Sequence, residues 1–158
     1  APDHNPEMEI MKQMMKGKER IDFAIFTFAK SSGIDDAMIK LLQCEMSIKG
    51  AFCGLLKNQY WSAINPLIEK GAELYGVPST ATLGKLHHKL MVIDDQVVIG
   101  GSFNYTSAAN RINDENIIIL GDLNSTDQNV IEAQKKIGSY ARREIERIIE
   151  EHGEKDED

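Results

Sequence analysis

Two nearly continuous apolar runs, residues 21–28 and 48–56, constrain the fold of this chain more than any other feature. Strands that are apolar without alternation are typical of a sheet that is covered on both faces. The segment between them, residues 34–42, carries apolar residues at helical spacing along one side. A strand, a helix and a second strand in this order predict an α/β fold in which neighbouring strands run parallel.

The rest of the chain continues this alternation of helices and strands. Short strands are predicted near Leu74 and over residues 117–120, and two more flank the turn formed by residues 94–96 in a tight hairpin. We therefore expect a mixed, largely parallel sheet flanked by helices. Domains of this class often open with a strand, whereas this chain goes straight into a helix, so that strand is either absent or precedes residue 1. The further helices are predicted after Pro6, over residues 59–70 and from residue 127 to residue 151.

The side chains that should face the core follow from helical spacing. In the first helix a stripe of methionines recurs at this spacing, which is typical of core packing. In the long final helix, five apolar residues are predicted to face the sheet. The methionines are Met8, Met11 and Met15, and the five residues are Ile131, Ile137, Tyr140, Ile145 and Ile149.

The charge of the chain is concentrated at its C-terminal end. Residues 150–158 contain six acids and one base, a net charge of −5, which leaves −2 for residues 1–149 out of a total of −7. We interpret residues 1–149 as one domain and residues 150–158 as a solvated acidic tail. The near-neutral body neither favours nor excludes a polyanionic substrate.

No targeting signal is visible in the sequence. A leader peptide would show a basic start and an apolar stretch, and a membrane span would need roughly 20 apolar residues; neither pattern occurs. The chain begins at Ala1, as a processed or excised piece would, and the sequence assigns it to no compartment.

Residues 87–116 carry the side chains that are suited to chemistry. His87 and Lys89 are two residues apart, so on an extended strand they project from the same side. An imidazole beside an ammonium suits a phosphate that must be attacked and neutralised. Ser102 and Asn104 follow a Gly-Gly pair and offer hydrogen-bond donors, while Glu115 is suited to orient the imidazole of a histidine.

Each of these residues alone has an ordinary structural explanation, but together they form a pattern. The spacing is H-x-K-x4-D-x6-G-S-x-N, completed by Asp94 and Gly101, with Glu115 and Asn116 downstream. It resembles the signature of the phospholipase D superfamily in every defining position. The chain has one copy of the pattern and in length is similar to the short bacterial endonucleases of that superfamily and their mitochondrial relatives.

This resemblance implies a mechanism and an assembly. His87 of one subunit would attack phosphorus and form a covalent phosphohistidine, while His87 of a second subunit would protonate the leaving oxygen. The active site would then lie at the two-fold interface of a homodimer, with no metal ion and no cofactor. The resemblance gives Asp94 a structural role. His88 should point to the opposite face of the strand, and we expect a structural or surface role for it.

Three functions fit the sequence. The leading hypothesis is a metal-independent endonuclease acting on DNA or RNA. The alternative is a phospholipase D-type lipid phosphodiesterase, for which Phe103, Tyr105 or Trp61 would contact a lipid or membrane, although the same rings would equally stack on bases or belong to the core. The third is a nucleic-acid-binding module of a longer protein.

Overall fold

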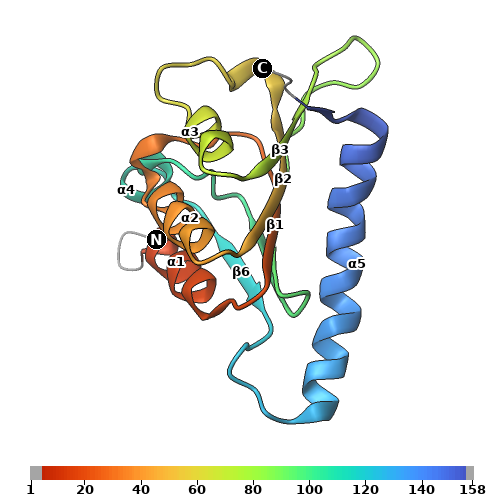
Figure 1. The fold of residues 1–158 in the computed structure, drawn as a ribbon. Helices are drawn as coiled ribbons and strands as arrows, with labels where there is room; N and C mark the ends of the chain where they lie inside the picture. The colour runs from red at the N-terminus through yellow and green to blue at the C-terminus, as the bar shows by residue number, and fades with distance from the viewer. Residues whose placement is uncertain (1–4, 156–158) are drawn as a thin grey trace.

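A computed structural model describes residues 5–155, and within this range seven strands form one sheet (Figure 1). The strand order is β6-β5-β4-β1-β2-β3-β7, in which β1, β2 and β3 run parallel and the other pairings are antiparallel. The α/β class with a mixed sheet is confirmed, with the parallel part limited to three strands. The strands are β1 (Arg20–Ile25), β2 (Ser47–Cys53), β3 (Glu73–Val77), β4 (Lys89–Ile93), β5 (Val97–Gly101), β6 (Ile117–Leu120) and β7 (Glu154–Lys155).

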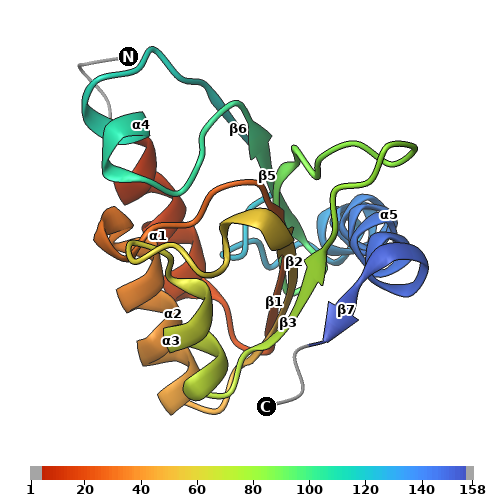
Figure 2. The ribbon, with the colours of Figure 1, turned by 90° about the horizontal axis from the view of Figure 1, so that it is seen from above.

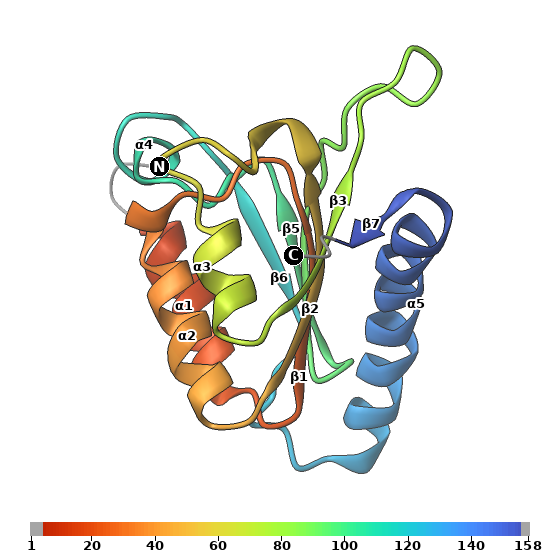
Figure 3. The same ribbon diagram turned by 45° about the horizontal axis from the view of Figure 1, so that its top comes forward.

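The helices lie on both sides of this sheet. All of them but α5 lie on one side of the sheet, and the long α5 crosses the other face alone, so the molecule has three layers (Figures 1 and 3). Burial on both sides explains why the two central strands are largely apolar, with Asp22 buried in an ion pair with Arg20. The helices are α1 (Pro6–Lys16), α2 (Ile34–Gln43), α3 (Ile64–Glu69), α4 (Ser107–Arg111) and α5 (Gln128–His152), with single 3-10 turns at Lys30–Ser32 and Gly54–Leu56.

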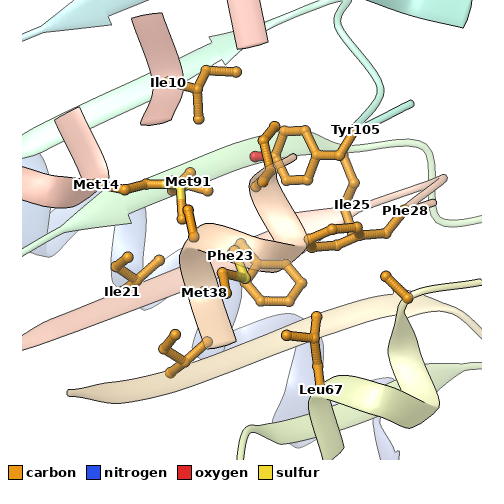
Figure 4. Packing of buried hydrophobic residues seen from close by; sticks show 14 of the residues in the cluster. Ile10, Met14, Ile21, Phe23, Ile25, Phe28, Met38, Leu67, Met91 and Tyr105 are labelled. Carbon is orange, nitrogen blue, oxygen red and sulfur yellow. The ribbon is translucent and has the colours of Figure 1, made fainter. Parts of the chain in front are cut away.

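The larger of two apolar cores lies between the sheet and the helices α1, α2 and α3 (Figure 4). Phe23 of β1 is fully buried at its centre, and the ring of Phe28 meets it edge to face at 5.9 Å. From α1 the buried side chains are Ile10 and Met14. The predicted methionine stripe is therefore wrong. Met8 and Met15 are exposed, and Met11 is only partly buried. Helical spacing allowed more than one apolar stripe, and α1 turns the stripe of Ile10 and Met14 toward the core.

The second core lies between the sheet and α5, where the prediction is half right. Ile145 and Ile149 are buried as expected, but Ile137 and Tyr140 are 54% and 73% exposed. In their place the helix turns Gly138 toward the hairpin between β4 and β5. A Cβ atom on this glycine would lie 1.9 Å from the carbonyl oxygen of Asp95, so the helix contacts the hairpin backbone directly.

The hairpin between β4 and β5 turns through two aspartates with positive φ. Asp94 and Asp95 have φ values of 52° and 56°, and the amide of Gln96 donates to the carbonyl of Ile93 at 2.9 Å. Both aspartates adopt the left-handed region that two-residue hairpin turns require, which Asp tolerates better than most residues. The side chain of Asp95 accepts a hydrogen bond from Arg142 of α5 at 2.6 Å, and this ion pair holds the helix against the turn.

The C-terminal segment contains helix and strand where a solvated acidic tail was predicted. The expected boundary at residues 149 and 150 falls inside α5, which continues to His152. Glu154 and Lys155 then pair with Gly76 and Tyr75 as β7, because the edge of β3 offers unpaired backbone groups. The part of the predicted tail at residues 156–158 lies outside the described residues. Within residues 5–155, no helix has the length and apolar character needed to cross a membrane.

The close contact at Gly138 leads to a stability prediction. Gly138→Ala should lower the free energy of unfolding by about 1–3 kcal/mol, because the added methyl group forces α5 away from the carbonyl of Asp95. Ser139→Ala, one position further along the same helix, is the matched control and should change stability by a few tenths of a kcal/mol at most. Urea denaturation of both variants measures the effect. Equal stability of the two would show that the helix does not depend on this contact.

Candidate active site

The predicted site residues His87 and Lys89 lie beside the C-terminal ends of the parallel strands, where Lys89 pairs with Ile25, the last residue of β1. This end of the sheet is the upper one in Figure 1. His87 precedes β4 and Lys89 is its first residue. The ammonium Nζ of Lys89 lies 3.2 Å from Nδ1 and 3.4 Å from Nε2 of the His87 ring, and it donates to the His87 carbonyl at 2.9 Å. The two side chains therefore project together, as their spacing predicted, and His87 is exposed to solvent.

Phe26 is a residue of this site that the sequence did not reveal. Its ring centroid lies 4.8 Å from that of His87, and the Lys89 ammonium lies 5.5 Å from the ring centroid. The amide of Phe26 also donates to the carbonyl of His88 at 2.9 Å. An aromatic face attracts a cation and restricts the neighbouring ring, so Phe26 positions both side chains.

Two further predicted residues, Ser102 and Glu115, are joined to each other. The Ser102 hydroxyl donates to a carboxylate oxygen of Glu115, and it accepts from the amide of Asn116 at 3.1 Å. The amide of Ser102 in turn donates to the Asn116 carbonyl at 3.1 Å. This close approach requires Gly101, because its φ is 141° and a Cβ atom there would lie 2.3 Å from the Asn116 oxygen.

Glu115 was predicted to orient a histidine, yet within residues 5–155 its hydrogen bonds go elsewhere. One carboxylate oxygen accepts from Ser102 and the other from the side chain of Asn113 at 3.4 Å. Its charge still acts on the site: partial burial lowers the pKa of Lys89, and the negative charge of Glu115 opposes that shift. Within one chain, the Glu115 carboxylate thus accepts a hydrogen bond from Ser102 and attracts the Lys89 ammonium electrostatically.

Asn104 lies in a segment that the continuation of β1 holds in place. The amide of Tyr105 donates to the carbonyl of Thr27 at 3.1 Å, and the amide of Ala29 donates back to the Tyr105 carbonyl at 2.8 Å. The Oδ1 atom of Asn104 is buried and accepts no hydrogen bond from a described residue. Buried polar atoms usually have hydrogen-bond partners, so this oxygen is an exception among the described residues.

The aromatic residues that were considered for lipid or base contact do not line the site. Phe103 and Tyr105 are each 2% exposed and belong to the main core, where the Tyr105 ring meets Phe28 edge to face at 5.2 Å. Burial raises the pKa of the Tyr105 hydroxyl. Trp61 is partly exposed.

Asp94 lies at the opposite end of β4 from His87. Its two carboxylate oxygens accept hydrogen bonds from the backbone amides of Lys18, Glu19 and Arg20 at 2.8, 2.8 and 2.9 Å. These contacts bind the hairpin to the start of β1 and so fix the strand that carries Lys89. Among residues 5–155, no group of three or more His, Cys, Asp or Glu side chains is placed to hold a metal ion.

The three amide contacts of Asp94 predict a stability loss on a conservative change. Asp94→Asn keeps the shape of the side chain but replaces one acceptor oxygen by a donor, which faces amides that also donate. We expect a decrease of about 1–3 kcal/mol in the free energy of unfolding. The control is Asp122→Asn, whose side chain accepts from the single amide of Asn124. A thermal or urea melt compares them, and an equal loss in both variants would contradict the special role of Asp94.

Comparison with known proteins identifies the family. Residues 10–147 match the family described as "Cardiolipin synthase, PLD-like domain". The chain is 29% identical over 147 residues to a mitochondrial cardiolipin hydrolase of Xenopus laevis, covering 90% of this chain and 60% of that protein. It is 30% identical over 117 residues to a phospholipase D of Rickettsia conorii, covering 72% and 54%. The chain thus spans about half to three fifths of the length of these relatives.

Solved structures share the fold. A phospholipase D family member, Nuc from Salmonella typhimurium, superposes with a TM-score of 0.72 at 16% identity, covering 100% of this chain and 95% of that one. NucT from Helicobacter pylori gives a TM-score of 0.71 at 19% identity, with 88% and 86% covered. The family match over most of the chain and this shared fold lead to one conclusion: the chain belongs to the phospholipase D superfamily.

Proposed function

We propose that this chain hydrolyses phosphodiester bonds through a covalent phosphohistidine and that its substrate is a nucleic acid. The observation that carries the proposal is the contact between Lys89 and the ring of His87, 3.2 Å from Nδ1, at an open edge of the sheet. Ligands of open α/β sheets bind at the edge where parallel strands end. A nucleophile and a fixed positive charge lie together at this edge.

The chemistry divides between the side chains as follows. A ring nitrogen of His87 attacks phosphorus, a nitrogen–phosphorus bond forms, and the bond from phosphorus to the leaving oxygen breaks. Lys89 neutralises a non-bridging oxygen, and Asn104 and Ser102 supply further polar contacts. Water then cleaves the nitrogen–phosphorus bond and restores the imidazole. Glu115 holds Ser102 in place and balances the charge of Lys89.

The leaving oxygen needs a proton from the side opposite to His87, because attacking and leaving groups of phosphoryl transfer lie roughly in line. One chain supplies one histidine of this kind. A second copy related by a two-fold axis would supply the other, and the two sites would merge into one. The exposure of His87 at the sheet edge leaves it accessible to such a partner.

A lipid phosphodiesterase is the second candidate. The relatives named above are a cardiolipin hydrolase and a phospholipase D. Ile112, three residues before Glu115, is also 82% exposed and would suit an apolar substrate or a membrane surface. The nucleic-acid substrate is preferred because the cavity beside His87 presents the cationic side chains of Lys85 and Arg147 next to its apolar residues.

A substrate panel tests both candidates. In EDTA we expect hydrolysis of single-stranded or duplex DNA or RNA and of bis(p-nitrophenyl) phosphate, because imidazole and ammonium replace a metal-activated water. His87→Ala should lower the rate by roughly a thousandfold or more without changing the urea midpoint. Loss of activity in EDTA with rescue by a divalent ion would refute the mechanism, and hydrolysis of phosphatidylcholine or cardiolipin alone would select the lipid function.

The shared site predicts a distinctive response to mixed subunits. When equal amounts of parent protein and His87→Ala exchange subunits, about one quarter of the dimers contain two intact histidines. The activity per total protein should therefore fall to about one quarter of the parent value, whereas independent sites would retain about one half. The measurement is an activity titration against the fraction of mutant after subunit exchange. A linear decrease, or full activity of a monomer identified by light scattering, would argue for a site within one chain.

A further inference from the structure

A cavity of about 430 Å³ lies behind the active site, on the face of the sheet that α5 covers. Its walls are the loop of residues 78–88 and the C-terminal half of α5, and Figure 2 shows this loop extending to the same side of the sheet as the helix. Leu86 and Ile148, both buried, form part of its floor. The volume is within the range of small-molecule sites.

The polar lining of this cavity is entirely basic. It consists of Lys85, Arg147 and the histidines His87, His88 and His152; Glu151, outside the lining, lies 3.6 Å from His152. Lys85 is exposed and forms no ion pair with any residue from 5 to 155. The ammonium of Lys85 and the guanidinium of Arg147, together with an apolar floor, match an anionic group attached to an uncharged body.

Arg147 is held in position by two carboxylates outside the cavity. Its Nε and Nη2 atoms donate to Glu144 at 2.9 and 2.7 Å, and Nη1 donates to Glu151 at 2.7 Å. A guanidinium has five N–H donors, so these three bonds leave two for a ligand. The carboxylates orient the guanidinium without exhausting it.

The cavity is continuous with the catalytic residues. His87 itself contributes to its wall, and His88 is the next residue along the chain. His88 lines the cavity, and the His87 ring both lines it and contacts the Lys89 ammonium, so His87 joins the cavity to the active site. The hydrogen bond from Phe26 to the His88 carbonyl fixes this segment between them.

We propose that this cavity is a subsite for a second phosphate of the substrate, the phosphodiester group next to the one that His87 attacks. This inference rests on the proposed function and deepens it, because a nucleic acid carries one phosphate per nucleotide and presents a second anion wherever the first is bound. The apolar floor accommodates the uncharged part of the adjoining nucleotide. His88 thereby gains a role beyond the surface role expected from sequence.

The experiment measures binding, so that it does not depend on catalysis. A fluorescein-labelled single-stranded oligonucleotide is titrated into protein carrying His87→Ala, at several salt concentrations, with and without Lys85→Ala. We expect roughly a three- to tenfold weaker Kd and a salt slope smaller by about one, as the loss of one phosphate contact requires. Lys85→Arg should restore both values. Since Lys85 is exposed on a loop, its replacement leaves the core intact.

Matched controls separate this subsite from general electrostatics. Lys135→Ala, on the exposed N-terminal half of α5, removes the same charge away from the cavity and should leave the Kd within twofold. Equal losses in Lys85→Ala and Lys135→Ala, or no loss in either, would overturn the subsite. Weaker binding of Lys85→Ala to cardiolipin-containing vesicles, with oligonucleotide binding unchanged, would overturn the nucleic-acid assignment. The proposed function is tested separately: a parent chain that does not hydrolyse bis(p-nitrophenyl) phosphate would contradict it, whatever the binding experiment shows.

Discussion

The carboxylate of Asp94 makes the interaction on which the arrangement of this molecule depends. It accepts hydrogen bonds from three consecutive backbone amides at the entry to β1, and in doing so it joins the tip of the β4–β5 hairpin to the beginning of the central strand. The pairing of β1 with β4 links residues about seventy positions apart, and it alone connects the parallel half of the sheet to the antiparallel half. Fixing one end of β4 sets its register, and the register places His87 and Lys89 at the other end.

The candidate active site is held together by the segment that follows β1, residues 26–29. Its residues contact both sides of the site: Phe26 holds the segment before β4, while Thr27 and Ala29 exchange hydrogen bonds with Tyr105. The segments that carry Lys89 and Ser102 are also joined by the pairing of β4 with β5, in which Leu90 lies opposite Gly100. Residues 26–29 contact both segments: Phe26 lies against His87, and Ala29 donates to the Tyr105 carbonyl. The residues that directly follow core strand β1 therefore help to position the candidate site.

The sequence was sufficient for the features that depend on local pattern. Apolar runs identified the central strands, and the two-residue spacing of His87 and Lys89 predicted that their side chains would project together. Features set by tertiary contacts were beyond it. Which stripe of α1 turns inward depends on the neighbouring α2, and the exposure of Tyr140 follows from the close approach of Gly138 to the hairpin. Phe26 looked like one more apolar strand residue, because only the antiparallel pairing of β1 with β4 brings its ring to His87.

The short strand β7 has a consequence for the behaviour of the molecule in a crowded solution. An open strand edge is a template on which another chain can pair and extend the sheet. Here the chain returns from α5 and covers the edge of β3 with the strand β7, which consists of the two charged residues Glu154 and Lys155. A strand this short and charged disfavours the pairing of another chain. Strand β7 therefore limits intermolecular growth of the sheet at this edge. Damage to this end would appear first as a loss of solubility, while the interior of the domain stayed folded.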